Sequence, residues 1–304
     1  MSKIITALNL LKKEPRKIVK VLGSNNLLNW IPDKTYLKIL YYCETGKKLN
    51  LENPKTFNEK LQWIKLYDRK PEYITYVDKY SVRDYIKKTI GEEYLIPLIG
   101  VYNTVDEILW GELPNQFVLK CTHGSGSNII CKDKNQLDII GAKKKLSKWM
   151  KKNWYWFGRE WPYKNLRPRI ICEEFISEDN EIPYDYKVMC FNGEAKLIQV
   201  HANRFAINHT QNFYDVMWNK TTISQGYSYG SFLSEGADKK PKCLETMLKL
   251  SEHLSRNTYH VRIDWYEVEG RLYFGEITLF DGSGLYPFDN ENDNLMLGSW
   301  ISLP

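Results

Sequence analysis

The feature that most constrains the fold of this chain is a pair of alternating runs near its C-terminus. Apolar and polar residues alternate in residues 261–265 and in residues 271–278, and a glycine-containing turn separates the two runs. Two such runs joined by a short turn predict a β-hairpin. The chain is therefore expected to end in strands that pair with each other.

The hairpin would gather charged side chains on one side of a sheet. Because successive side chains of a strand point to opposite faces, Arg262 and Asp264 share a face of the first strand. Glu276 and Thr278 share a face of the second strand in the same way. Two carboxylates that meet repel each other unless a cation lies between them, and oxygen ligands with room for water and phosphate suit Mg²⁺. Alternatively, Asp264 and Glu276 are exposed residues that balance Arg262 and Arg271, which is ordinary on a solvated face.

Composition sets broad limits on the rest of the chain. A length of 304 residues with 43% apolar and 26% charged residues fits a globular protein of two or three units. The net charge of +6 fits an anionic ligand or a membrane surface and does not by itself imply nucleic acid. The six cysteines are scattered with no CxxC pair, which argues against a zinc site and indicates a reducing compartment, hence the cytoplasm.

The first 22 residues are basic and amphipathic. Their apolar run is too short and broken for a signal peptide or a transmembrane helix. Two interpretations stay open: peripheral contact with anionic lipid, or short helices whose basic face is solvated.

Helical and strand patterns then alternate along the chain. Residues 24–75 are expected to be helical, and Thr56 with Glu59 forms a capping box before an apolar stripe in residues 58–67. The turn Asn192-Gly193 predicts a second hairpin. The other expected helices are 79–89, 105–109, 134–152 and 241–255, and the other expected strands are 94–99, 116–121, 129–131, 170–176, 184–191 and 194–201.

A glycine-containing loop, residues 122–128, lies between two of these strands. Strand, loop and strand predict a flap whose backbone N–H groups can approach phosphates. The loop has neither the GxxxxGK[ST] nor the GxGxxG pattern, so a tight turn is the competing interpretation. Lys120 precedes the loop and is placed to meet an anion beneath it. His123 lies inside the loop, where a structural role and a substrate contact are equally open.

Several stretches, taken together and in order, carry a resemblance. They are NPKTFNEKLQW, VDKYSVRDY, FVLKCTHGSGSNIICKDK, ICEEFI, YDYKVMCFNG, HVRIDWYEVEGRLYFGEIT and DGSG. As a set they resemble the TupA-like ATP-grasp proteins of bacterial polysaccharide loci. The resemblance implies an α+β ATP-grasp fold, in which two α+β subdomains clasp ATP. We expect a helical N-terminal region at 1–75, the subdomain with the flap at 76–168, and the subdomain with the metal site at 169–304.

The resemblance also implies roles for individual residues. Asp264 and Glu276 match the magnesium ligands, and Thr278 stands where the third ligand is commonly Asn. Arg262, Arg204 and Lys187 would face the transferred phosphoryl group. The residues expected to bind ATP are Lys79, Lys120, Gly124, Ser125, Gly126, Glu173, Glu174, Phe175, Ile176 and Asp185.

The implied function is an ADP-forming carboxylate–amine ligase that uses ATP and Mg²⁺. Its expected partners are a uronate of a capsular or O-antigen polysaccharide, or a lipid-linked precursor, and an amino acid or other amine. Phosphoryl transfer agrees with this residue set because it needs positioning and charge neutralisation. Candidate acceptor-binding residues are Trp154, Tyr155, Trp156 and Tyr163, with core packing or a lid as the alternative. The rival functions are a glycosyltransferase, for which no clear DxD motif exists, and a non-catalytic nucleotide-binding scaffold at the membrane.

Overall fold

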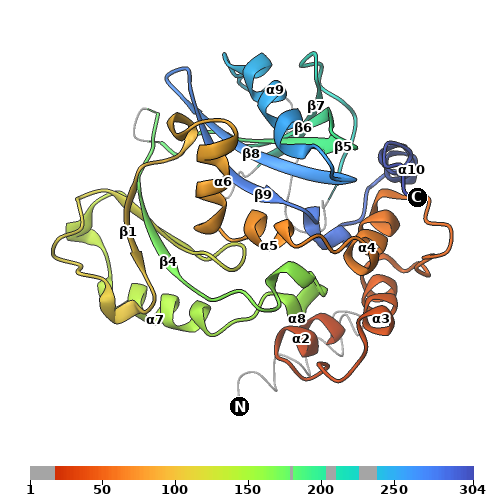
Figure 1. Ribbon diagram of the computed structural model, residues 1–304, viewed down its shortest axis with the longest axis horizontal. Coiled ribbons are helices and arrows are strands. Elements are labelled where there is room, and N and C mark those ends of the chain that lie inside the picture. Colours follow the sequence, from red (N-terminus) through yellow and green to blue (C-terminus); the bar gives the residue numbers. More distant parts are fainter. Residues whose placement is uncertain (1–17, 179–180, 203–209, 226–237) are drawn as a thin grey trace.

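The computed structural model describes residues 18–178, 181–202, 210–225 and 238–304, and within them it contains two antiparallel sheets (Figure 1). The larger sheet has the strand order β7-β6-β5-β8-β9 and the smaller has the order β1-β4-β2-β3. The strands are β1 (Leu98–Tyr102), β2 (Phe117–Cys121), β3 (Asn128–Cys131), β4 (Ile170–Glu174), β5 (Asp185–Phe191), β6 (Glu194–Ala202), β7 (Thr210–Asp215), β8 (His260–Val268) and β9 (Arg271–Thr278).

Helices cover both sheets, which confirms the expected α+β class. No helix in the described ranges is long and apolar enough to cross a bilayer, and residues 1–17 of the basic N-terminal segment lie outside those ranges. The helices are α2 (Ile18–Ser24), α3 (Asp33–Thr45), α4 (Phe57–Tyr67), α5 (Glu72–Val77), α6 (Ser81–Thr89), α7 (Ile139–Met150), α8 (Tyr155–Gly158), α9 (Leu244–Ser255) and α10 (Glu291–Ser299). Short 3-10 turns are η2 (Glu92–Tyr94), η3 (Val105–Glu107), η4 (Lys134–Gln136), η5 (Trp161–Tyr163) and η7 (Asp281–Gly284).

The larger sheet has one apolar and one charged face. Helix α9 packs on the apolar face, where Trp265 Nε1 donates a hydrogen bond of 2.8 Å to Ser251 Oγ. Because neighbouring residues on a strand alternate, Asp264 then lies on the opposite face. That face looks toward the smaller sheet and carries the candidate site.

Helices α4, α5 and α6 belong to the core of the larger sheet, although they come before the smaller sheet in sequence, whereas α3 contributes to a separate buried cluster. Phe57, Leu61 and Ile64 of α4 share one buried cluster with residues of β5, β6, β8 and β9. The expected capping box begins α4: Glu59 N donates to Thr56 Oγ1 at 3.2 Å, and Thr56 N donates to Glu59 Oε2 at 3.1 Å. In Figure 1, α4 accordingly lies beside the C-terminal helix α10. The smaller sheet has a separate core with α7.

Three expected elements differ from the structure. The strand predicted at 94–99 begins only at Leu98, because Pro97 has no N–H to donate to a neighbouring strand. The helix predicted at 134–152 is interrupted, because Asp138 caps a new helix and accepts a hydrogen bond of 2.9 Å from Gly141 N. The helix predicted at 105–109 is only the short 3-10 turn η3, which spans Val105–Glu107.

Two neighbouring segments connect the smaller sheet to the larger unit. The chain enters the smaller sheet after residues 90–97 and leaves it after Glu174, the last residue of β4. The two connections start next to each other, because Glu174 N donates to Pro97 O at 3.0 Å. Leu95 also bridges to Phe274 of the larger sheet. Both connections therefore lie along one edge between the sheets.

Candidate functional site

The predicted hairpin is present, and its register brings the acidic residues together. Asp264 of β8 lies directly opposite Glu276 of β9, and Arg262 lies opposite Thr278. Paired residues of adjacent strands have side chains on the same face. The two carboxylates and the Thr278 hydroxyl therefore lie on one face of the sheet, with Asp264 buried.

Cations neutralise these carboxylates. Arg262 donates to Asp264 through Nε at 2.7 Å and through Nη2 at 2.9 Å, and its Nη1 donates to Asp281 Oδ1. Lys187 of β5, next to β8, pairs with Asp264 Oδ2 and lies 2.7 Å from Asp185 Oδ2. Four strand residues and Asp281 of η7 thus form a single charge network.

The network separates the pKa values of its two central carboxyls. Burial raises the pKa of Asp264, and the nearby charges of Arg262 and Lys187 only partly oppose it. Burial also raises the pKa of Glu276, but Lys79, Lys187 and Arg262 together hold it well below its usual value. Glu276 is therefore anionic at neutral pH and available to a cation.

Lys79 joins the hairpin to the glycine flap. Its Nζ donates to Glu276 Oε2 at 2.7 Å and to Gly124 O at 3.0 Å. Its backbone N also donates to Thr122 O at 3.1 Å. The flap residue Gly126 has φ +71°, a conformation that glycine adopts easily. The expected phosphate-binding lysine thus touches both sides of the site.

Lys120 and Glu173 form a second charged group at the smaller sheet. Lys120 Nζ lies 2.6 Å from Glu173 Oε2, and Arg83 Nη1 lies 2.7 Å from Glu173 Oε1. Glu173 is buried, so its carboxylate faces these cations in the interior. The sequence interpretation did not include Arg83, which comes from α6 and carries no motif of its own.

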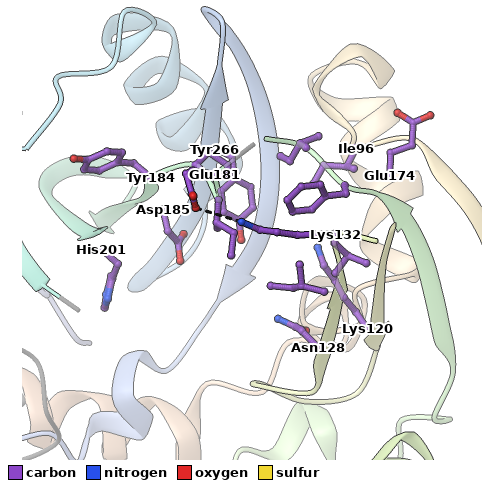
Figure 2. A pocket seen from close by; sticks show the side chains of 16 residues that line it. Ile96, Lys120, Asn128, Lys132, Glu174, Glu181, Tyr184, Asp185, His201 and Tyr266 are labelled. Carbon is purple, nitrogen blue, oxygen red and sulfur yellow. Dashed lines mark hydrogen bonds and ion pairs between the residues drawn. The ribbon is translucent and has the colours of Figure 1, made fainter. Parts of the chain in front are cut away.

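A cavity of about 530 Å³ lies between the sheets (Figure 2). Lys120 and Asn128 reach it from the smaller sheet, while Tyr184 and Asp185 lie on the opposite side. Lys132 and Glu181 form an ion pair of 3.3 Å at its lining. Much of the lining is apolar: Ile96, Val118, Ile130, Phe175, Ile176, Ile182 and Pro183. An apolar slot with a few polar groups suits a planar ring joined to an anionic tail.

A second cavity of about 320 Å³ adjoins the first, and His201 lines both. It begins at the charge network, where Lys79, Lys187 and Arg262 line it, and it includes Ser125 of the flap. Aromatic side chains form another part of its lining: Trp154, Phe157, Tyr163, Phe280 and Tyr286.

The donor set at the hairpin fits a magnesium ion. Asp264 and Glu276 supply hard carboxylate oxygens, and Thr278 Oγ1 lies 3.5 Å from Glu276 Oε1. Within the described residues no three His, Cys, Asp or Glu side chains converge as a complete metal site. Magnesium usually keeps water and phosphate oxygens in its shell, so two carboxylates are a sufficient protein contribution.

A buried lysine holds the loops around the second cavity, and sequence reasoning did not identify it. Lys65 Nζ, from α4, donates to Gly158 O at 2.9 Å, Ser283 O at 2.7 Å, Ser283 Oγ at 2.9 Å and Gln62 Oε1 at 3.1 Å. Gln62 Nε2 donates to Ser283 O and Gly284 O as well. We call this group the Lys65 clamp. Its only sequence signal is a lysine inside the apolar stripe of α4.

The remaining candidate residues lie in different places. His123 is buried and its Nε2 lies 3.2 Å from Trp149 O. Tyr155 and Trp156 pack around the guanidinium of Arg159. Arg204 lies outside the described residues. Of the four candidate acceptor-binding aromatics, Trp154 and Tyr163 line the second cavity.

Comparison with known proteins identifies one family model. The model "TupA-like ATPgrasp" matches residues 59–302. None of the curated proteins matches the chain.

Several solved structures match the chain at low identity and with TM-scores below 0.5. They include D-alanine–D-alanine ligase from Bacillus anthracis complexed with ATP, at 13% identity and a TM-score of 0.40, with 67% of this chain and 55% of that chain covered. D-cycloserine synthetase has 13% identity and a TM-score of 0.43, with 76% and 70% covered. The ligase PsnB, complexed with a phosphomimetic variant of its minimal precursor, Mg and ADP, has 7% identity and a TM-score of 0.39, with 73% and 57% covered. The chain thus spans just over half the length of the first of these ligases.

Proposed function

The chain belongs to the TupA-like ATP-grasp family, and on this premise we propose that it is an ATP- and Mg²⁺-dependent ligase that joins a carboxylate to an amine. The observation that carries the proposal is the position of Lys79. Its ammonium contacts Glu276 of the β8–β9 hairpin, the proposed metal site, and at the same time Gly124 of the flap. A triphosphate placed there would meet a lysine, a flap backbone and a pair of carboxylates together.

The two cavities suggest how ATP would lie. The adenine ring would occupy the apolar first cavity beside Phe175 and Ile176, with Glu174 and Asp185 at its rim. The phosphates would run past Lys120 toward Lys79, beneath Gly124, Ser125 and Gly126. Bound at Asp264 and Glu276, Mg²⁺ would neutralise phosphate charge.

The chain's own cations would then assist the chemistry. A substrate carboxylate oxygen attacks the γ-phosphorus of ATP, the bond to the bridging oxygen breaks, and ADP leaves. Lys187 and Arg262 stabilise the charge that develops on the transferred phosphoryl group. The amine then attacks the carbonyl carbon of the acyl phosphate, phosphate leaves, and the nitrogen loses a proton. Arg204 remains a further candidate for this role.

We further propose that the carboxylate belongs to a uronate of a bacterial surface polysaccharide or its precursor, and that the amine is an amino acid or a related compound. The association of the resembled family with polysaccharide loci supports this assignment. The free thiols of all six cysteines suit the cytoplasm. The basic residues 1–22 would bring the enzyme to the inner face of the membrane, where lipid-linked sugars are found.

Product analysis tests the proposal. Purified protein with ATP, Mg²⁺, a uronate and an amine should release ADP and phosphate, and EDTA should stop the reaction until Mg²⁺ is restored. Release of AMP and pyrophosphate would refute the ADP-forming mechanism.

Two isosteric variants test whether Asp264 and Glu276 of the β8–β9 hairpin bind the metal. We expect Asp264→Asn and Glu276→Gln each to lower kcat by more than about 100-fold, because a metal ligand is removed. Circular dichroism should show that both variants stay folded. Glu245→Gln is the matched control, since the Glu245 side chain is 83% exposed on α9. Full activity in Glu276→Gln would show that Glu276 is not a metal ligand.

A further inference from the structure

We infer that the second cavity is a sugar-acid subsite, in which an aromatic wall receives one face of the ring and buried acceptors bind its hydroxyls. This inference rests on the proposed function and names the residues and the ligand class of its acceptor site. The observations are the cavity's lining, two buried oxygen atoms without donors, and the position of the cations.

The aromatic wall is the first observation. Trp154, Phe157, Tyr163 and Tyr286 line the cavity without being fully buried themselves. Lys65 donates hydrogen bonds to Gly158 O and to Ser283 O, which lie close in sequence to these aromatic residues. The Lys65 clamp therefore fixes the segments that carry the aromatic wall. Aromatic rings combine a flat apolar face with low conformational entropy, which suits the C–H face of a sugar ring.

Two buried acceptors are the second observation. Gln199 Oε1 and Asp281 Oδ2 line the cavity and have no hydrogen-bond partner among the residues that the structure describes. Gln199 and Asp281 are 4% and 3% exposed as whole residues. A buried acceptor without a donor is energetically unfavourable, so these two atoms call for donors from a ligand. Hydroxyl groups of a sugar are donors of this kind.

The cations are the third observation. Lys79 and Arg262 line the end of the cavity that adjoins Glu276 and Thr278. A carboxylate at that end would lie beside the phosphoryl-transfer site, with the rest of the ring directed toward Trp154. A volume of about 320 Å³ is at the small end of the range for small-molecule sites. The cavity therefore suits a single sugar-acid ring with a carboxylate at one end.

Binding measurements on the full chain test the inference without requiring turnover. With AMP-PNP and Mg²⁺ present, calorimetry should detect binding of glucuronate or galacturonate, and glucose and L-glutamate should bind about tenfold more weakly or not at all. Glucose lacks the carboxylate, and glutamate lacks the ring. Trp154→Ala and Gln199→Leu should each weaken uronate binding about tenfold and leave AMP-PNP binding unchanged.

Controls separate this inference from the proposed function. Trp154→Phe should restore most of the affinity, and Trp30→Ala is the matched control because Trp30 is 80% exposed and lines neither cavity. Failure of AMP-PNP to bind would count against the proposed function. Binding of AMP-PNP without any uronate binding would overturn the sugar-acid subsite alone. If glutamate binds and Gln199→Leu weakens that binding, the cavity is the site of the amine substrate, and the sugar-acid subsite is overturned as well.

Discussion

Replacing Lys65 with methionine tests whether the clamp holds the loops around the second cavity. Methionine fills a similar volume but removes four hydrogen bonds of 2.7–3.1 Å from a fully buried ammonium. The acceptors that remain lose a charged donor, and the buried carboxyl of Glu160 loses a nearby positive charge. We expect a loss of about 3 kcal/mol in the free energy of unfolding at pH 7, because the change breaks a buried charged network.

The pH dependence of this loss identifies its cause. Burial raises the pKa of Glu160, and the charge of Lys65 opposes that shift. Without Lys65 the pKa of Glu160 in the folded state rises further, so folding is favoured while the carboxyl is protonated. Stability is then lost as the pH rises through that pKa. Burial lowers the pKa of Lys65 itself only to about 8, so its own titration lies above the window from pH 5 to pH 7.

Urea unfolding at pH 5 and pH 7 measures both effects. Lys65→Met should be more destabilising at pH 7 than at pH 5, and adding Glu160→Gln should recover about 1 kcal/mol of the loss. Lys249→Met is the matched control, because the Lys249 side chain is 71% exposed on α9 and its replacement should change stability by less than about 0.5 kcal/mol. A loss below about 1 kcal/mol, or one that is equal at both pH values, would refute the clamp.

Three further variants test other parts of the structure. Burial lowers the pKa of His260 to about 4, so the neutral side chain is the form that the folded state favours. The resulting contribution to the free energy of unfolding is fully present above pH 6.5 and declines as the pH falls, by about 2 kcal/mol at pH 5. His260→Phe should therefore flatten the stability profile between pH 7 and pH 5 in urea unfolding, and an unchanged slope would contradict this. Thr56→Ala should lower stability by about 1 kcal/mol by removing the cap of α4, and an unchanged urea midpoint would show that the cap is not stabilising. Gly158→Ala should lower the Tm because its Cβ would lie 2.1 Å from Ser283 Oγ, whereas Gly111→Ala, with nothing within 4 Å, should not; equal Tm values would exclude the close packing.

The hairpin could be predicted from sequence because its information is local. Alternation alone predicts that Arg262 shares a face with Asp264 and that Glu276 shares one with Thr278. The register set by the two-residue turn would place Asp264 opposite Gly275, and a β-bulge next to Asp264 shifts the pairing by one residue so that Asp264 faces Glu276. The turn at Asn192-Gly193 between β5 and β6 was predicted as well, and a bulge also follows in that hairpin.

The partners of these residues could not be predicted in the same way. The clamp joins Lys65 to Ser283, which lie 218 positions apart, and Arg83 meets Glu173 across 90 positions. No periodicity relates such positions, because tertiary packing alone brings them together. Asp281 illustrates the limit: the stretch DGSG contributes to the family resemblance, but only the fold brings this carboxylate to Arg262.

The shared core of α4 and the C-terminal strands has a consequence for biosynthesis. Phe57 and Leu61 emerge from the ribosome long before β8 and β9, whose residues belong to the same buried cluster. The smaller sheet, whose contacts lie within residues 98–174, can form in the interval. Contacts between residues far apart in sequence form slowly, and a partly folded chain with an exposed apolar helix is prone to aggregation until those contacts form. We therefore expect the apolar face of α4 to stay exposed on the nascent chain until the last strands are translated.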